Sequence, residues 1–440
     1  MKILKAFAAA VSAAVLLTGC SFGSDIDGLM APPKLSVEQE QIYKALTDAT
    51  GTSISLKYPT SGKYLSAFIV EDIDGDGGNE AVVFYEKTGL TVEENILRIN
   101  ILDRTNGKWR SVCDTPAEGA NIEKIIISRL GTNDKINLII GTTLINRSEK
   151  NAAIYNYSSD GSIVKTFSKS CSFIDVTDLD GDKENEFLML TGSSGDSPAA
   201  AEAYKLDTQG TYHQYSVSLS GSFTEFDKTK YGNFGSDGKA LYIDAVSGTG
   251  YIQTDVIYMD GKGLHKVFEI PEESLSTVRP SGCSCADIDG DGTIEIPVQE
   301  LSPGYEDVSV SEQMNITEWM YIDGENTLKK KYSSYYSVAD GYIFLFPEKW
   351  RDRITVKRDA VNDEIVFCSY TNGQVGRELM RLYCATDSPS EEDRLANGYS
   401  LLRTKGETVF LACIPEYEEP YDDNLALTSA ELTLGFRMSE

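Results

Sequence analysis

Three short acidic segments carry the residues best suited to chemistry. Each begins Asp-x-Asp-Gly-Asp and has a glutamate at its ninth position: residues 72–80, 178–186 and 287–295. Carboxylates clustered this closely repel one another unless a cation lies among them, and calcium takes about six to eight oxygens from flexible loops. We therefore expect about three calcium ions. The candidate ligands, at positions 1, 3, 5, 7 and 9, are Asp72, Asp74, Asp76, Gly78 and Glu80; Asp178, Asp180, Asp182, Glu184 and Glu186; and Asp287, Asp289, Asp291, Thr293 and Glu295.

The residues after each acidic segment exclude an EF-hand or a dockerin. Those loops need an acid near position 12 and a following helix. Here residues 81–85, 187–190 and 296–298 are β-prone and apolar. The acidic segments are therefore expected to connect two strands, with position 7 offering a backbone carbonyl.

Strand and turn signals repeat along the chain at a spacing of about 50–60 residues. Asn-Gly, Asp-Gly or Gln-Gly pairs predict hairpins at residues 106–107, 160–161, 209–210, 260–261 and 323–324. Two further units have lost the acids and place Arg129 and Lys239 at ligand positions, where a side-chain cation is expected to replace the ion. Five units of four short strands predict a mainly β chain containing a β-propeller of about five blades. The alternative is an open array or a sandwich of similar strands.

The acidic segments resemble the loops of the FG-GAP and VCBS repeat families, which are β-propeller modules. The resemblance covers roughly residues 62–338, and we place the propeller at 61–338. Clear Phe-Gly and Gly-Ala-Pro signatures are missing, and the ninth residue is glutamate where integrin-type loops usually have aspartate. The resemblance implies calcium binding but no integrin-like ligand specificity.

The cysteines and histidines offer little for metal or redox chemistry. With Cys20 set aside, an odd number of the 8 cysteines remains, without the spacing of a disulfide framework, and 2 histidines make a zinc site unfavourable. Cys283 and Cys285 form a Cys-x-Cys pair that could suggest redox or metal chemistry. They align with apolar strand positions of the other units, which favours core packing.

The N-terminal residues predict an exported lipoprotein. Lys2 and Lys5 precede an apolar run over 6–17, which is shorter than the roughly 20 residues that span a bilayer. Leu17-Thr18-Gly19-Cys20 resembles a lipobox, so residues 1–19 read as signal peptide, Cys20 as the lipidated residue and 20–35 as a tether. The alternative is an ordinary signal peptide with an incidental cysteine. The expected location is the extracytoplasmic face of the cell membrane.

Different modules flank the repeats. A capping box at Ser36 predicts a helix within a 36–60 linker segment. Residues 339–440 carry strands and helices without an acidic loop and predict a small α+β domain. This domain weakly resembles PsbP-like modules through Phe346-Pro347-Glu348-Lys349-Trp350.

Composition and motifs favour binding over catalysis. A net charge of −28 makes nucleic acid a poor partner. The sequence has no Gly-x-Ser-x-Gly elbow, P-loop or His-Glu-x-x-His, so no catalytic residue is predicted. The favoured function is a calcium-binding recognition or scaffold module for an envelope protein or glycan. The alternative is a glycan-active hydrolase or lyase that uses paired carboxylates.

Overall fold

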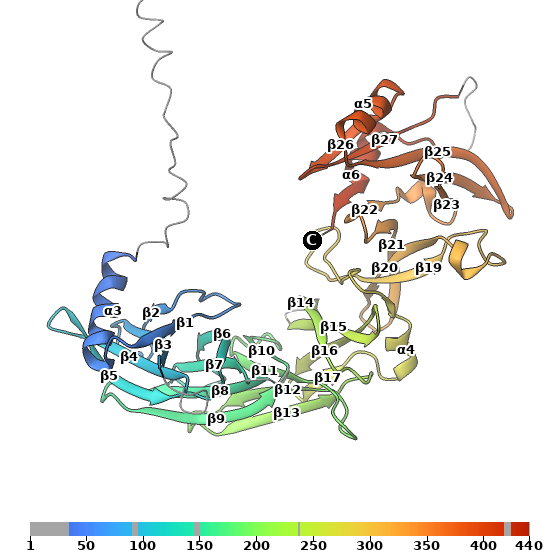
Figure 1. Ribbon diagram of the computed structural model, residues 1–440. Helices are drawn as coiled ribbons and strands as arrows, with labels where there is room; N and C mark the ends of the chain where they lie inside the picture. Colours follow the sequence, from blue (N-terminus) through green and yellow to red (C-terminus); the bar gives the residue numbers. More distant parts are fainter. Residues whose placement is uncertain (1–34, 90–95, 145–149, 236–237, 418–423, 440) are drawn as a thin grey trace, which may run out of the picture.

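The described part of the chain is mainly β and forms six sheets that succeed one another in sequence order. The computed structural model describes residues 35–89, 96–144, 150–235, 238–417 and 424–439. The predicted signal peptide and Cys20 lie outside these residues. Figure 1 shows the sheets following an arc, with α3 (Val37–Thr50) at one end and the C-terminal sheet at the other.

The first three sheets consist of antiparallel strands joined by short connections. Sheet 1 contains β1 (Ile54–Lys57), β2 (Phe68–Glu71), β3 (Glu80–Lys87), β4 (Arg98–Thr105) and β5 (Lys108–Pro116). Sheet 2 contains β6 (Asn121–Ser128), β7 (Asn137–Thr143), β8 (Lys150–Tyr157) and β9 (Ile163–Cys171). Sheet 3 contains β10 (Phe173–Thr177), β11 (Glu186–Thr191), β12 (Ala200–Leu206) and β13 (Tyr212–Ser218).

The remaining three sheets complete the arc. Sheet 4 contains β14 (Phe226–Phe234), β15 (Gly238–Gly248), β16 (Tyr251–Asp260), β17 (Gly263–Lys266) and β18 (Arg279–Pro280). Sheet 5 contains β19 (Ile296–Leu301), β20 (Asn315–Ile322), β21 (Leu328–Ser337), β22 (Tyr342–Leu345) and β28 (Phe436–Met438). Sheet 6 contains β23 (Ile354–Asp359), β24 (Glu364–Thr371), β25 (Gln374–Ala385), β26 (Ser400–Lys405) and β27 (Thr408–Cys413).

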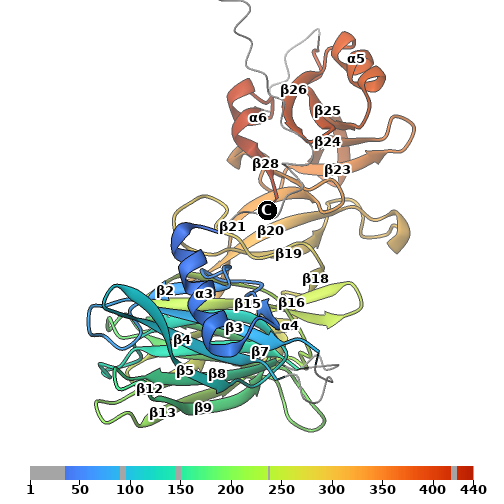
Figure 2. The ribbon, with the colours of Figure 1, turned by 60° about the vertical axis from the view of Figure 1, so that its left-hand side comes forward.

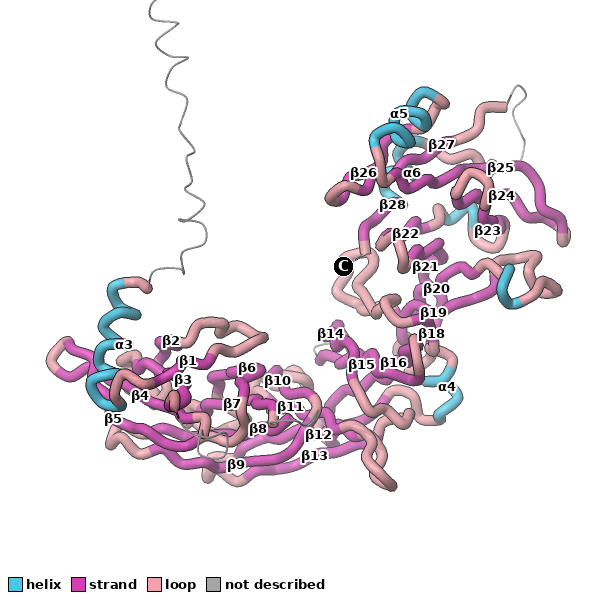
Figure 3. Tube along the Cα trace, viewed as in Figure 1, coloured by secondary structure: helices cyan, strands magenta, loops and turns pink. Residues whose placement is uncertain are grey.

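Helices are few among the described residues, as Figure 3 shows by colour. Beyond α3 they are α4 (Pro271–Leu275), α5 (Ser388–Ala396), α6 (Ser429–Gly435) and the 3-10 turns Val310–Glu312 and Glu348–Trp350. The capping box predicted at Ser36 is present: its hydroxyl accepts from the Gln39 amide, and the Gln39 side chain accepts from the Ser36 amide.

The five predicted hairpin turns are confirmed. They join β4 to β5, β8 to β9, β12 to β13, β16 to β17 and β20 to β21. At the first of them, Asn106 and Gly107 have φ of 53° and 73°, which is the backbone of a tight two-residue hairpin. Local turn chemistry therefore sets the inner pairing of each sheet.

Apolar cores lie between successive sheets. Between sheets 1 and 2, Val82 and Ile99 pack against Ile125, Leu138 and Ile140. Equivalent cores lie between sheets 2 and 3, 3 and 4, 4 and 5, and 5 and 6. Inner strands such as β3 are buried on both faces, which explains their nearly continuous apolar sequence.

Helix α3 covers the outer face of sheet 1. Its buried Ile42 and Leu46 pack against Ala81, Val83 and Tyr85, which alternate along β3 with the residues that face sheet 2. Figure 2 shows α3 in front of the first sheet. The face that a last sheet would need in order to close a ring is therefore occupied. The arrangement is propeller-like in its succession of sheets, but in the described residues it forms an arc with a covered end.

Sheet 5 extends past the predicted boundary at residue 338. A tight turn in which Gly341 has φ of 68° returns the chain, so β22 pairs antiparallel with β21. The C-terminal strand β28 then pairs with β22. Residues 342–345, expected in the C-terminal module, belong instead to the fifth sheet.

A buried polar cluster joins sheet 4 to the segment before loop 3. Cys283 and Cys285 are buried, as predicted, and Cys285 belongs to the core between sheets 4 and 5. Arg279 is fully buried, and its Nη2 lies 2.7 Å from Oδ1 of the equally buried Asp244. The Asp244 carboxylate also accepts from the Cys285 amide at 2.9 Å.

Candidate metal centre in three acidic loops

The three acidic segments occupy equivalent places in sheets 1, 3 and 5. We name them loop 1 (72–80), between β2 and β3; loop 2 (178–186), between β10 and β11; and loop 3 (287–295), immediately before β19. The position-9 glutamates begin β3 and β11, while Glu295 pairs with Ala286 just before β19. Loops 1 and 2 thus start and end on paired strands, and the Ala286–Glu295 bridge closes loop 3, so the two ends of each loop are fixed.

The first aspartate of each loop holds the turn together. In loop 1 the Asp72 carboxylate accepts from the amides of Gly75 at 2.6 Å and Gly77 at 3.1 Å. Asp178 and Asp287 make the same two bonds in their loops. Position 4 is glycine in all three loops, with φ between 81° and 83°, as the tight turn requires.

The aspartates at positions 3 and 5 each use one oxygen in the loop backbone. In loop 1, Asp74 Oδ1 accepts from the Asp76 amide at 3.1 Å, and Asp76 Oδ1 accepts from the Gly78 amide at 2.7 Å. The same bonds recur in loops 2 and 3. The second oxygen, Oδ2, of each aspartate is left for another partner.

The glutamate at position 9 is buried in every loop. Glu80, Glu186 and Glu295 are 2%, 0% and 0% exposed. Their Oε2 atoms accept from the amide at position 2, at 3.0, 2.7 and 2.9 Å. This bond orients the second oxygen, Oε1, toward the aspartates.

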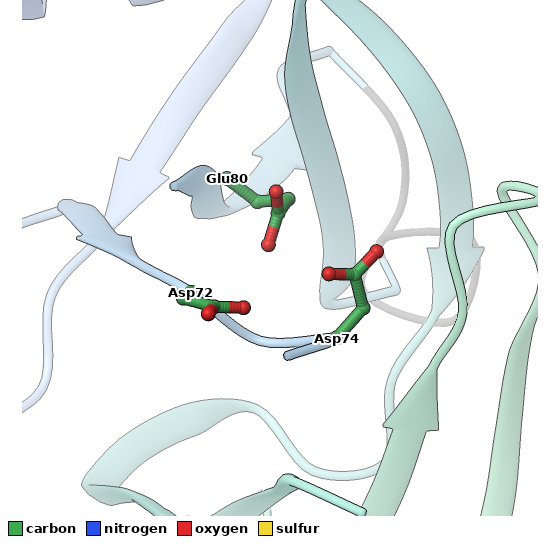
Figure 4. A group of neighbouring side chains, drawn as sticks. All are labelled: Asp72, Asp74 and Glu80. Carbon is green, nitrogen blue, oxygen red and sulfur yellow. The ribbon is translucent and has the colours of Figure 1, made fainter. Parts of the chain in front are cut away.

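The carboxylates of each loop converge on one point. Ligand atoms lie within 4.8 Å of one another in three groups: Asp72, Asp74 and Glu80; Asp178, Asp180 and Glu186; and Asp287, Asp289 and Asp291. Figure 4 shows the first group, with the three side chains directed toward a common space. The acids Asp76, Asp182, Glu184 and Glu295 lie outside these three side-chain groups, and the backbone carbonyls of the position-7 residues Gly78, Glu184 and Thr293 stay predicted ligands. The arrangement is suited to a hard cation that prefers oxygen ligands.

Two lysines that the sequence reasoning missed enter loops 2 and 3. In loop 2, Lys205 Nζ lies 2.9 Å from Asp180, 2.5 Å from Asp182 and 3.0 Å from Glu186. In loop 3, Lys331 Nζ lies 2.8 Å from Asp289, 2.7 Å from Asp291 and 2.8 Å from Glu295. Each ammonium therefore contacts positions 3, 5 and 9 of its loop.

Loop 1 contains no such cation among the described residues. Burial, together with the negative charges of Asp74, Asp103 and Asp76, raises the pKa of Glu80 to about 7. Burial also raises the pKa of Asp74, and the charges of Asp76, Asp72 and Asp103 add to that rise. Burial likewise raises the pKa of Glu186 to about 7 despite its contact with Lys205, whereas bonding to Lys331 lowers the pKa of Asp291. Because lysine ion pairs are present in loops 2 and 3 and none is found in loop 1 among the described residues, loop 1 is the acidic loop whose charge is least compensated.

Two further residues of the sequence predictions are Arg129 and Cys20. The Arg129 guanidinium donates to the Asp134 carbonyl at 2.9 Å, within the sheet 2 counterpart of the acidic loops. Cys20 lies outside the described residues. No helix in the described segments is long and apolar enough to span a bilayer.

Comparisons with known proteins add little at this site. No protein-family model matches the chain, and no curated protein matches its sequence. Among solved structures, the chain is similar to a periplasmic gluconolactonase of Pseudomonas aeruginosa, with 12% sequence identity and a TM-score of 0.31. That match covers 74% of this chain and 88% of the other. A likeness at this level supports no conclusion about the site or the activity, which must be judged from the chain's own residues.

Proposed function

We propose that this chain is a calcium-binding recognition protein of the bacterial cell envelope, attached to the membrane through a lipid on Cys20. The observation that carries the calcium proposal is in loop 1. Asp74 and Glu80 converge with Asp72 on one space, and Asp74 Oδ2, Glu80 Oε1 and the nearby Asp76 Oδ2 have no hydrogen-bond or ion-pair partner among the described residues.

Calcium suits this donor set better than other common metals. All side-chain donors are oxygens, and oxygen ligands favour hard cations over softer ions such as zinc or copper. The loop is a glycine-containing turn rather than a rigid octahedral cage, and calcium accepts flexible coordination where magnesium demands near-ideal geometry. Residues Asp72, Asp74, Asp76 and Glu80 would hold the ion, with the Gly78 carbonyl as a further donor.

Calcium would act by compensating charge. Loop 1 holds four acids, and Asp103 adds a fifth nearby. Extracellular modules bind calcium at about 10⁻⁴–10⁻³ M, and a tenfold excess over the dissociation constant adds about 1.4 kcal/mol to stability. A calcium titration followed by thermal melting tests this directly. A melting temperature that does not change with up to about 10 mM calcium refutes it.

A hydroxyl-lined cleft favours a glycan as the recognised partner. The cleft, of about 540 Å³, lies at the end of β11 opposite loop 2 and is lined by residues from sheets 2 to 4. Ser170, Ser172, Ser193 and Thr224 contribute hydroxyls, and Phe226 contributes an aromatic ring. Hydroxyls both donate and accept, which matches the hydroxyls of a sugar, and an aromatic face packs on its apolar side.

The same cleft favours binding over hydrolysis. Glycosidases use two carboxyl groups flanking the scissile bond. Among the described residues that line the cleft, Glu225 is the one carboxylate. The hydrolase or lyase alternative therefore lacks its second acid at this place.

The cleft offers a clean test through Thr224. Its side chain is exposed and its hydroxyl has no hydrogen-bond partner among the described residues, so Thr224→Val removes a polar group from the cleft without breaking a bond of the fold. We expect Thr224→Val to weaken retention on a panel of envelope polysaccharides and peptidoglycan fragments. Thr52→Val, at an exposed bend outside the cleft lining, is the matched control. Retention unchanged by Thr224→Val and Phe226→Ala would exclude the cleft, and turnover of a glycan would favour the hydrolase.

Membrane attachment is tested separately. Cys20→Ala should abolish labelling with a radioactive fatty acid, because it removes the thiol that receives the diacylglyceryl group. Labelling that persists in this variant would refute the lipid anchor.

A further inference from the structure

We propose that Lys205 and Lys331 are tethered cations that occupy the ion positions of loops 2 and 3, so that calcium binds loop 1 alone. This inference rests on the proposed calcium function and makes it specific. It replaces the expectation of three ions with one, and it identifies the residues that set the number.

The two lysines reach the same atoms from different strands. Lys205 lies on β12, and Lys331 lies on β21, at an irregularity in its pairing with β20. Both nevertheless place Nζ against Oδ2 at position 3, Oδ2 at position 5 and Oε1 at position 9. Because two lysines from different strands contact the same set of three oxygens, we infer that this set requires a cation.

Carboxylates surround each ammonium group. A lysine ammonium has three N–H donors and no acceptor, and each of these lysines makes two hydrogen bonds to its loop and lies within 3.0 Å of a third carboxylate oxygen. A calcium ion entering loop 2 or loop 3 would have to displace all three contacts. Because the lysine is covalently held beside the loop, it competes at a high effective concentration, of millimolar order or above. That is comparable with or above the dissociation constants of about 10⁻⁴–10⁻³ M expected for such calcium loops.

Loop 1 presents the same three oxygens without a lysine. Glu80 is only 2% exposed, points into the acid group in Figure 4, and leaves Oε1 without a partner among the described residues. A buried carboxylate oxygen of this kind is costly unless an ion fills the space beside it. In loop 3 the equivalent oxygen accepts a hydrogen bond from Lys331 at 2.8 Å, and in loop 2 it lies 3.0 Å from the Lys205 ammonium as an ion pair without a hydrogen bond.

The difference between loops 1 and 2 can be traced to one ladder position. Ala81 pairs with Leu102 in sheet 1, and Phe187 pairs with Tyr204 in sheet 3. Extending each ladder by one residue would set Glu80 opposite Asp103 and Glu186 opposite Lys205, whose Nζ lies 3.0 Å from Glu186. Sheet 1 therefore has an acid where sheet 3 has the lysine, and exchanging the two residue types should exchange the behaviour of the loops.

The experiment counts calcium ions on the full chain by isothermal titration calorimetry after chelator treatment. We expect one ion for the wild type, two for Lys205→Met, two for Lys331→Met and none for Asp103→Lys. Lys169→Met is the matched control, because Lys169 pairs with Glu202 outside the loops, and it should leave the count at one.

Melting temperatures give a second readout. Without calcium, Lys205→Met should melt below the wild type and recover when calcium is added, since the ion replaces the lost ammonium. Asp103→Lys should melt above the wild type without calcium and gain nothing from it. This variant adds a counter-charge, so the inference stays testable even if Lys205→Met does not fold without calcium.

The outcomes separate this inference from the proposed function. Three ions on the wild type would overturn the lysine inference while keeping calcium binding. An unchanged count in both lysine variants would also overturn it. No ion on the wild type but one on each lysine variant would uphold the lysines and refute loop 1 as the calcium site. No ion on any variant would refute calcium binding altogether.

Discussion

Glu80→Gln should make the calcium-free protein more stable at neutral pH, although it removes a proposed ligand. The substitution keeps an oxygen that can accept from the Ile73 amide, a bond of 3.0 Å in the wild type. It removes the negative charge that Glu80 acquires among Asp74, Asp76 and Asp103. The change thus isolates the cost of an ionised carboxylate in loop 1.

The pKa of Glu80 sets the size and sign of this effect. Burial first, and neighbouring negative charges second, raise it from an ordinary 4.5 to about 7. A raised carboxyl pKa means that the folded state holds the proton more tightly than the unfolded state. Stability from that proton is present below about pH 4.5 and is lost as pH rises through about 7. A difference of about 2.5 pKa units corresponds to about 3 kcal/mol, at about 1.4 kcal/mol for each unit.

Urea unfolding followed by circular dichroism, in chelator, at several pH values from about 4.5 to 8, measures the effect. The unfolding free energy of the wild type, minus that of Glu80→Gln, should fall by about 3 kcal/mol across this range. Other titrating groups cancel because both proteins share them. Added calcium should reverse the order of stability at pH 8, since it stabilises the wild type more. A difference that stays constant with pH, or a Gln variant that is the less stable protein at pH 8 without calcium, would refute the reasoning.

Three other substitutions test the fold around the loops. Lys183 occupies position 6 of loop 2 with φ of 75°, where loops 1 and 3 have glycine, so Lys183→Gly should raise the unfolding free energy by about 1 kcal/mol. The control Lys262→Gly, in a turn of ordinary φ, should not raise the unfolding free energy. A loss of stability in Lys183→Gly would contradict this account. Arg279→Leu should cost about 3–5 kcal/mol in urea unfolding because it leaves the Asp244 carboxylate buried without its cation. A cost below about 1 kcal/mol would show that the pair does not stabilise the polar cluster that joins sheet 4 to the segment before loop 3. Leu46→Ala should cost about 2–5 kcal/mol and weaken the cover on sheet 1, whereas Val37→Ala, at an exposed position of the same helix, should change stability little; equal effects would argue against α3 as a cover.

The local structure of this chain was predictable because short-range signals determine it. Asn106-Gly107 and its counterparts specify hairpins through their backbone preferences alone. The capping box at Ser36 and the glycine at position 4 of each acidic loop act within a few residues. The acid groups of the three loops follow from the same local patterning.

The lysines were not predictable because they depend on long-range register. The connection between β11 and β12 does not fix which residue of β12 lies opposite Glu186, so Lys205 could not be assigned to loop 2. Lys331 enters loop 3 at a register shift between β20 and β21, which the sequence does not mark. The expectation that Arg129 and Lys239 replace ions in the two units without acids stays a prediction; the side-chain cations found here lie within two of the acidic loops themselves.

The packing of α3 on the outer face of sheet 1 was also not predictable from the sequence. Helix α3 was expected as a spacer, but the alternation of Ala81, Val83 and Tyr85 with residues facing sheet 2 gives sheet 1 a second apolar face. From sequence, that face would be read as the contact with a closing blade of a propeller. The choice between a ring and an arc depends on which partner reaches this face, and strand patterning does not specify the partner.

The most direct test of the calcium proposal is an anomalous difference map from a crystal of the mature protein grown with calcium. We expect one strong peak in loop 1, within coordination distance of Asp74, Asp76 and Glu80, and lysine density in loops 2 and 3. An empty loop 1 in calcium-grown crystals would contradict the central claim.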